Sequence, residues 1–400
     1  MESQDDEHPS TKIFRDYIRI PSVHPNPDYS KTVEFLISRA EMMALPYTVC
    51  HCAPDKPTLV VTWPGTNPSL SSVLLNSHMD VVPVFPEHWT YPPFSAHKDD
   101  QGNIYGRGTQ DMKCVGIQHL EAVRRLKEQG KKLKRTVHIC YVPDEEIDGE
   151  FGMMGFVKTE AFKNLNVGFS MDEGMASVDD ELPLYYGERS CFWIKVTCPG
   201  SPGHGSRFLP NTAGEKARKV INKLLEYRDK EERRLETNPE LTLGDVTTVN
   251  LTLMQGGVQV NVVPDMFILN FDIRISPTTD MDQFEDMLRG WLREAGDDVT
   301  MEFIVPKHSD QTLTSVDQND PWFAALNKAF VNQQLNVAPQ IFAANTDSRH
   351  LRAAGVAAFG FSPMPNTKIL LHDHDECLNE KTFLKGIDIF AEIIENVANV

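Results

Sequence analysis

The sequence predicts an α/β domain with a mixed, mostly parallel sheet flanked by helices, interrupted by an inserted α+β domain. Strand-like runs alternate with helical patterns up to residue 187 and again after residue 306, which is typical of such a sheet. Between residues 188 and 306 the predicted order becomes β-α-β-β-α-β, the order of a ferredoxin-like unit. The length of 400 residues also exceeds what one hydrophobic core usually supports.

In the first part of the chain, the helices are predicted from apolar residues that recur every three to four positions. One helix begins near Ser10, a second begins near Ser30 after a proline-rich turn, and a third covers residues 113–128. Short β-rich runs predict strands at 58–63, 73–77, 135–142 and 167–171. Because strands and helices alternate here, we expect parallel pairing between strands.

The inserted part begins with an alternating strand at residues 191–198 and a charged helix at 212–236 that carries one apolar stripe. Two further strands, a helix and a final strand are predicted at 247–254, 267–275, 282–294 and 299–305. These elements complete the ferredoxin-like order.

After the polar segment 306–318 the α/β pattern returns. A helix is opened by Asp320 and Pro321, and a last helix covers residues 380–397. The sequence therefore predicts one domain made of residues 1–187 and 307–400, and an inserted domain of residues 188–306.

The charge and the cysteine content of the chain limit which partners and which cellular compartment we expect. The 39 basic against 57 acidic side chains give a formal net charge of −18, the wrong sign for binding nucleic acid or anionic lipid, so we expect neither partner. The N-terminal residues are acidic, which does not match a secretory or mitochondrial signal. Seven cysteines without such a signal are typical of reduced thiols, so we expect a cytoplasmic protein.

Candidate catalytic side chains follow the predicted strands. His78 and Asp80 end the run 73–77, and a carboxylate this near a histidine can accept its second ring N–H and leave the other nitrogen for a metal. A purely structural hydrogen bond is the alternative. Asp111 ends a glycine-punctuated loop just before the helix at 113–128, where it is either a functional group or the N-cap of that helix.

Acidic runs follow two more strands, and a histidine-rich run lies near the C-terminus. Glu145 and Glu146 belong to a run of four acids in five residues, and Asp172 and Glu173 end the strand at 167–171. Carboxylates packed after buried strands repel each other, and a cation is the natural compensation. Histidine and carboxylate ligands without cysteine suit one Zn²⁺ or a pair of ions.

Such a site would activate water, and a free carboxylate beside the metals would move its proton to a leaving amine. This chemistry predicts amide hydrolysis, with phosphoester hydrolysis as its chemical competitor.

These motifs, in this order, resemble the five metal-site motifs of the di-zinc aminoacylase and carboxypeptidase family, whose fold is zinc-exopeptidase-like. They surround His78, Asp111, Glu145, Glu173 and His372, and the resemblance extends over essentially the whole chain. It implies hydrolysis of N-acyl-L-amino acids, such as N-acetylated methionine, to a carboxylate and a free amino acid. A dipeptidase or carboxypeptidase of the same family, and a non-catalytic binding homologue, are the alternatives.

The resemblance implies two Zn²⁺ ions per subunit. One would be held by His78, Asp111 and Glu173, and Asp111 would bridge to a second ion held by Glu146 and His372.

In the same comparison Glu145 becomes the general base, and Asp80 orients His78. Asp172 is the rival of Glu173 as a ligand, and His374 is the rival of His372.

The inserted domain resembles the dimerisation and lid domain of the family. His204 would reach the partner's active site in a homodimer and stabilise the oxyanion; otherwise it is an exposed turn histidine. Asn261 and Arg274 match substrate-binding positions of the family; otherwise each is a strand-end polar residue that makes a structural contact. A free α-carboxylate calls for an arginine that can hold it through two hydrogen bonds, and Arg349 and Arg274 are the candidates. Arg352 is a weaker candidate for that role.

Overall fold

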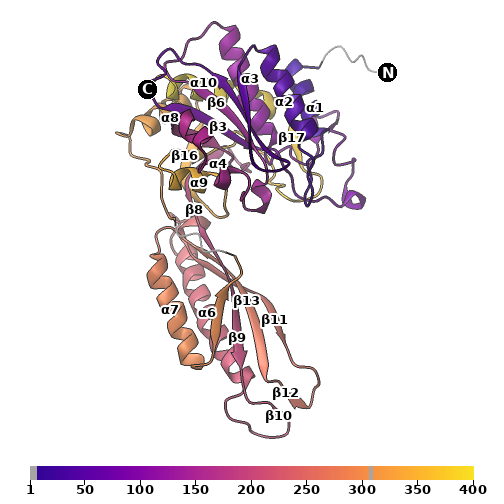
Figure 1. Ribbon diagram of the computed structural model, residues 1–400, viewed down its shortest axis with the longest axis vertical. Coiled ribbons are helices and arrows are strands. Elements are labelled where there is room, and N and C mark those ends of the chain that lie inside the picture. The colour runs from indigo at the N-terminus through magenta and orange to yellow at the C-terminus, as the bar shows by residue number, and fades with distance from the viewer. Residues whose placement is uncertain (1–6, 306–309) are drawn as a thin grey trace. The chain divides into compact units, whose positions relative to one another are not determined.

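The chain forms two compact units in the computed structural model, which describes residues 7–305 and 310–400 (Figure 1). Unit 1 consists of the described residues up to Tyr186, together with Thr314–Pro339 and Thr346–Val400. Unit 2 consists of the described residues of Gly187–Leu313 and Gln340–Asn345. The predicted domain boundary at residues 306/307 lies outside the described residues. The catalytic and dimerising roles assigned to the two parts stay predictions.

An eight-stranded mixed sheet forms the centre of unit 1, with the strand order β1-β2-β6-β3-β7-β16-β8-β15. The four central strands β6, β3, β7 and β16 pair in parallel. At one end of the sheet, β2 pairs antiparallel with both β1 and β6. The predicted mixed sheet is confirmed, and its parallel part is the centre. The strands are β1 Tyr47–Ala53, β2 Lys56–Trp63, β3 Ser72–His78, β6 Val137–Val142, β7 Val167–Asp172, β8 Glu181–Glu188, β15 Asn336–Phe342 and β16 Ala357–Gly360.

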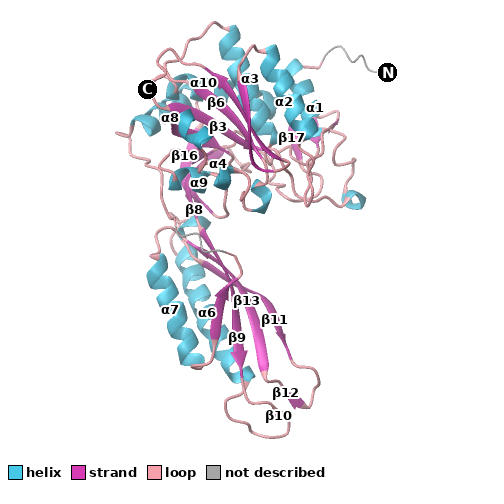
Figure 2. Cartoon of the chain, in the orientation of Figure 1, coloured by secondary structure: helices cyan, strands magenta, loops and turns pink. Residues whose placement is uncertain are grey.

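Both faces of this sheet are covered by helices (Figure 2). Alternate residues of β3 show why: Val73 and Leu75 join one apolar core, whereas Leu74 joins the other. The larger core lies under α1 Pro9–Ile18, α2 Ser30–Met42, α3 Lys113–Glu128, α8 Pro321–Asn332 and α10 Glu380–Val397. The smaller core lies under α4 Met153–Phe156, α5 Glu160–Leu165 and α9 Ser348–Ala353. None of the described helices has the length and apolar character needed to cross a membrane.

The topology brings the candidate side chains together. Because β3, β6 and β7 are parallel neighbours, their carboxyl ends lie at one edge of the sheet. A small sheet of β4 His97–Lys98, β5 Asn103–Tyr105 and β17 Cys377–Asn379 pairs β17 with β5. This pairing places the residues just before β17 beside those just after β5.

Unit 2 has the ferredoxin-like order that the sequence predicts. Its antiparallel sheet has the strand order β11-β13-β9-β14, and two long helices, α6 and α7, contribute to its core. β10 and β12 form a separate two-stranded ribbon. The elements are β9 Ser190–Pro199, β10 Gly203–His204, α6 Ala213–Glu236, β11 Thr248–Gly256, β12 Val262–Val263, β13 Met266–Ile275, α7 Met281–Ala295 and β14 Thr300–Phe303.

A buried histidine in α3 is expected to make unit 1 sensitive to acid. His119 is fully buried against the ring of Phe390, and in the described part of the chain neither ring nitrogen has a hydrogen-bond partner. Burial lowers the pKa of His119 to about 3. Its ring therefore stays neutral in the folded state while the unfolded chain takes up a proton below about pH 6.5.

This difference gives stability that is present above about pH 6.5 and is lost as the pH falls. Between about pH 8 and pH 5 we expect the group to lower the free energy of unfolding by about 2 kcal/mol. In His119→Leu the decline should be shallower by that amount. Denaturant unfolding at several pH values measures both curves, and parallel curves would contradict the assignment.

Candidate metal centre

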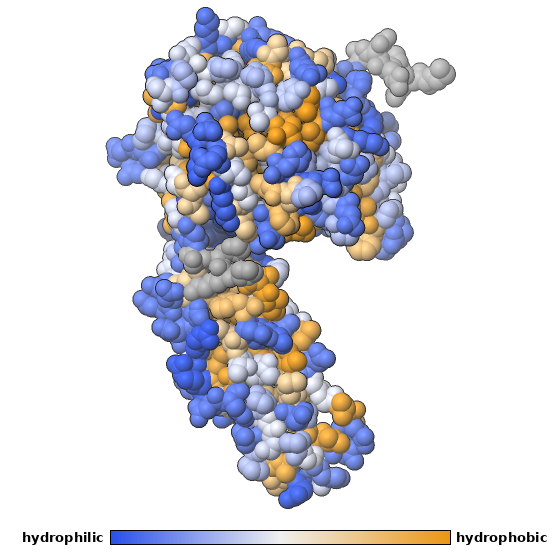
Figure 3. Space-filling model, in the orientation of Figure 1, coloured by the Kyte–Doolittle hydropathy of each residue, from blue (hydrophilic) through white to orange (hydrophobic). Residues whose placement is uncertain are grey.

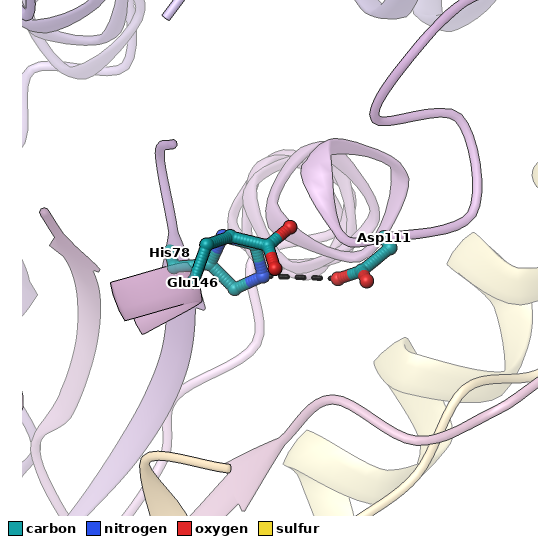
Figure 4. A group of neighbouring side chains, drawn as sticks. All are labelled: His78, Asp111 and Glu146. Atoms are coloured by element: carbon teal, nitrogen blue, oxygen red, sulfur yellow. Dashed lines mark hydrogen bonds and ion pairs between the residues drawn. The ribbon is translucent and has the colours of Figure 1, made fainter. Parts of the chain in front are cut away.

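Asp111 lies between two histidines at the carboxyl edge of the sheet. One carboxylate oxygen, Oδ1, is 3.0 Å from Nε2 of His78, and the other, Oδ2, is 3.2 Å from Nε2 of His372. The same nitrogen of His372 is 3.1 Å from Oε2 of Glu146. Figure 4 shows His78, Asp111 and Glu146 converging on one space from three separate segments of the chain. A carboxylate with an oxygen toward each histidine is placed as a bridging ligand would be.

Two more glutamates approach His78. Oε2 of Glu173 is 3.6 Å from Nε2 of His78, and Oε2 of Glu145 is 4.0 Å from it. Among the described residues, two groups each contain one donor atom per residue within 4.8 Å of the others: His78 with Asp111 and Glu146, and His78 with Glu145 and Glu173. Distance alone therefore allows Glu145 to be either a ligand or a base.

The buried carboxylates of this cluster favour the binding of a cation. Burial and the neighbouring Glu173 raise the pKa of Glu145, and burial together with Asp111 raises the pKa of Glu146 and of Glu173. Oε1 of Glu146 is buried and has no hydrogen-bond partner among the described residues. Buried carboxylates that repel each other, with one oxygen unpaired and two histidines beside them, form a donor set that suits divalent metal ions.

The structure separates the predicted ligands from their alternatives. Asp111 does not cap α3, because Met112 occupies the N-cap position and no side chain caps that end. The carboxylate of Asp172 accepts hydrogen bonds from Asn76 and from Ser348, 3.0 Å and 2.8 Å long, so that it is engaged away from His78.

The two histidines of the C-terminal motif also differ. The ring of His374 packs against those of His88 and Phe85. Nε2 of His372, by contrast, points to the carboxylates of Asp111 and Glu146. The metal roles of Glu173 and His372 stay predictions, but the geometry favours them over Asp172 and His374.

Asp80 orients His78 differently from the expectation. Nδ1 of His78 is 2.9 Å from the main-chain oxygen of Asp80 but 3.7 Å from its carboxylate. The carboxylate is engaged elsewhere: it lies 2.8 Å from Nε2 of His24 and accepts the backbone N–H groups of Glu145 and Glu146. Asp80 therefore holds the imidazole through its carbonyl group and the Glu145–Glu146 turn through its carboxylate.

Three residues that support the site escaped the sequence analysis. His24 lies in the proline-rich turn before α2 and contacts Asp80. Tyr29 and Lys56 each donate a hydrogen bond of 2.7 Å to Asp144, which adopts a left-handed conformation (φ 63°) directly before Glu145. No local pattern marks these residues, because each contact joins segments far apart in the sequence.

The predicted substrate residues occupy both units. In unit 1, Arg349 donates a 2.5 Å hydrogen bond to the carboxylate of Asp148. In unit 2, Arg274 is paired with Asp272 at 2.7 Å, and its guanidinium lies over the ring of Trp193.

The other two predicted residues of unit 2 are exposed. His204, at the end of β10, has Nδ1 2.8 Å from Oγ of Ser206, and Asn261 accepts a hydrogen bond from Gln259. The roles of His204, Asn261, Arg274 and Arg349 stay predictions.

The family model and the relatives that match this chain agree on one protein family. The sequence model described as peptidase family M20/M25/M40 matches residues 74–396. Aminoacylase-1 of Sus scrofa is 51% identical over 394 residues, covering 98% of this chain and 96% of that protein. Aminoacylase-1 of Dictyostelium discoideum is 44% identical over 409 residues, covering 99% of both. The predicted resemblance is confirmed.

A solved structure supports the fold. The Bacillus subtilis YXEP protein, described as a dinuclear metal binding peptidase from the M20 family, has a TM-score of 0.69 and 16% identity, and the match covers 96% of each chain.

Proposed function

Since the chain belongs to peptidase family M20/M25/M40, we propose that it is a zinc-dependent enzyme that hydrolyses N-acyl-L-amino acids to a carboxylate and a free L-amino acid. The observation that carries this proposal is the placement of Asp111 between His78 and His372, with Glu145, Glu146 and Glu173 around them. Identity of about half to aminoacylase-1 proteins, across nearly the whole chain, supports the substrate class.

The donor set divides into two sites that share Asp111. His78, Asp111 and Glu173 would hold one zinc ion, and Asp111, Glu146 and His372 would hold the other. When bound, two such ions lower the pKa of a water molecule and polarise the carbonyl of the scissile amide.

Glu145 is the proposed general base. Its carboxylate takes a proton from the attacking water as the C–O bond forms, and the resulting carboxyl gives that proton to the nitrogen as the C–N bond breaks. Burial beside Glu173 raises the pKa of this carboxyl, which supports a group that holds a proton between the two steps. Asp80 positions Glu145 by accepting its backbone N–H group.

Substrate orientation is assigned to the predicted polar residues. The guanidinium groups of Arg349 and Arg274 are the two candidates for binding the free α-carboxylate, and Asn261 is a candidate for binding the substrate. In this proposal Arg349 exchanges its ion pair with Asp148 for one with the substrate.

We further propose a homodimer in which His204 of one subunit donates a hydrogen bond to the oxyanion in the partner's site. β11 lies at the edge of the sheet of unit 2, which supports an interface there. Exposed apolar residues of unit 2 (Figure 3) support it as well. These residues include Trp193, Phe208, Leu253, Met254, Val258, Val260 and Met266. The seven cysteines, none of which forms a disulfide in the structure, support a cytoplasmic location.

Substrate preference tests the proposal. Purified protein should hydrolyse N-acetyl-L-methionine faster, in kcat/KM, than an unacylated dipeptide such as alanyl-methionine. Activity should disappear on chelation and return with Zn²⁺. A preference for the dipeptide would replace the aminoacylase activity by a dipeptidase or carboxypeptidase activity, and absence of metal-dependent cleavage of either substrate would refute hydrolysis altogether.

A further inference from the structure

Two segments that carry proposed ligands are cross-linked by buried hydrogen bonds. We call residues 106–111 the Asp111 loop and residues 368–377 the His372 segment. The carboxylate of Glu376 is fully buried, with Nη1 of Arg107 at 2.7 Å and the backbone nitrogen of Gln110 at 2.6 Å. The backbone N–H groups of Gly108 and Asp111 also point to this carboxylate, at 3.2 Å. One side chain of the His372 segment thus holds most of the Asp111 loop.

The side chain of Gln110 makes the reciprocal contact. Its Nε2 donates to the main-chain oxygens of Lys368 and Cys377, at 2.9 Å each, and its Oε1 accepts the N–H group of Leu370 at 3.0 Å. Gln110 therefore ties both ends of the His372 segment to the loop that carries Asp111. Both the amide nitrogen and the amide oxygen of Gln110 are thus engaged by the His372 segment.

Apart from its contacts with Asp111 and Glu146, the side chain of His372 is largely open to solvent. Its side chain is 55% exposed and its backbone is left-handed (φ 60°), so its position depends on the backbone on either side. Asp111, by contrast, is buried. The distance between Oδ2 of Asp111 and Nε2 of His372 is consequently set by how the two segments are joined.

We propose that Gln110 and Glu376 are positioning residues that form a clamp between Asp111 and His372, and that this clamp determines the affinity for the metal ion held by Asp111, Glu146 and His372. The inference rests on the proposed two-metal function. Groups that orient metal ligands typically change affinity 10- to 100-fold when they are removed. The ion held by His78, Asp111 and Glu173 shares Asp111, which is buried and lies 3.0 Å from Nε2 of His78, but it does not use the His372 segment and should be affected little.

Gln110→Met tests the clamp, because methionine is neutral and of similar length but makes none of the three hydrogen bonds. Gln118→Met is the matched control: Gln118 is also a buried glutamine that donates to a main-chain oxygen, that of Phe383, but it joins α3 to α10. Glu376→Gln is made in parallel as a second test of the clamp. Each full-length variant is depleted of metal and titrated with Co²⁺, and bound Co²⁺ per chain is measured.

Wild type and Gln118→Met should each bind two Co²⁺ ions. For each of the two sites, the affinity should be the same in both proteins. Folded Gln110→Met and Glu376→Gln should bind one ion as wild type does and the second at least tenfold more weakly. Two ions bound with wild-type affinity in a folded clamp variant, or equal weakening of both ions, would overturn the clamp. Fewer than two ions on the wild-type protein would refute the two-metal proposal itself, and the clamp with it.

Discussion

Replacing Glu145 by glutamine is expected to lower kcat for N-acetyl-L-methionine by about 100- to 10,000-fold, with little change in KM and no loss of metal. Glutamine has nearly the shape of glutamate but cannot accept the proton of the attacking water. The backbone N–H of Glu145 would still be held by Asp80, so that the turn keeps its position. Steady-state kinetics on the variant measure the effect.

The control is Glu150→Gln, the same chemical change at an exposed position of the following turn. It should leave kcat unchanged. A Glu145→Gln enzyme with near wild-type turnover would refute Glu145 as the base.

Replacing His204 by asparagine is expected to lower kcat by about 100- to 1,000-fold, because the shorter asparagine side chain lacks the Nε2 donor proposed for the oxyanion. Since the histidine is proposed to act in the partner's site, the loss should be repairable between subunits. His204→Asn and Glu145→Gln should each be nearly inactive, but a mixed dimer of the two would contain one site with both groups intact.

After free subunit exchange, half of the dimers are mixed, and each has one complete site out of two. The mixture should therefore recover about a quarter of the wild-type activity. Recovery is measured after refolding or prolonged incubation of the two variants together. If exchange occurs and no activity returns, His204 does not act across the dimer.

Many of the long helices and strands could be predicted from the sequence, because the residue pattern that specifies each of them lies within the element itself. The helix predicted at 113–128 is α3 with the same bounds, since its apolar spacing and the preceding loop define it locally. β1, by contrast, is not among the strands predicted from β-rich runs: it lies at the edge of the sheet, and none of its residues is buried. Its pairing with β2, through a turn at Asp55, depends on tertiary context.

The candidate site was predictable to a similar degree. Acidic residues and histidines directly after buried strands could be recognised in the sequence, and parallel pairing of β3, β6 and β7 then places them at one edge. The contact of Asp80 with His24, 56 residues away, could not be predicted. Nor could the contacts of Gln110 with the segment that holds His372, because nothing local to either segment specifies them.

One ambiguity in the geometry leads to the most direct test. Oε2 of Glu145 lies 4.0 Å from Nε2 of His78, and a carboxylate oxygen of Glu145 lies within 4.8 Å of one of Glu173. These distances also fit a Glu145 that binds metal instead of acting as the base. Zinc bound per chain and turnover of N-acetyl-L-methionine, measured on the same Glu145→Gln preparation, separate the two roles. We expect two zinc ions per chain with turnover reduced at least 100-fold; a loss of zinc in step with activity would contradict the role of Glu145 as the base.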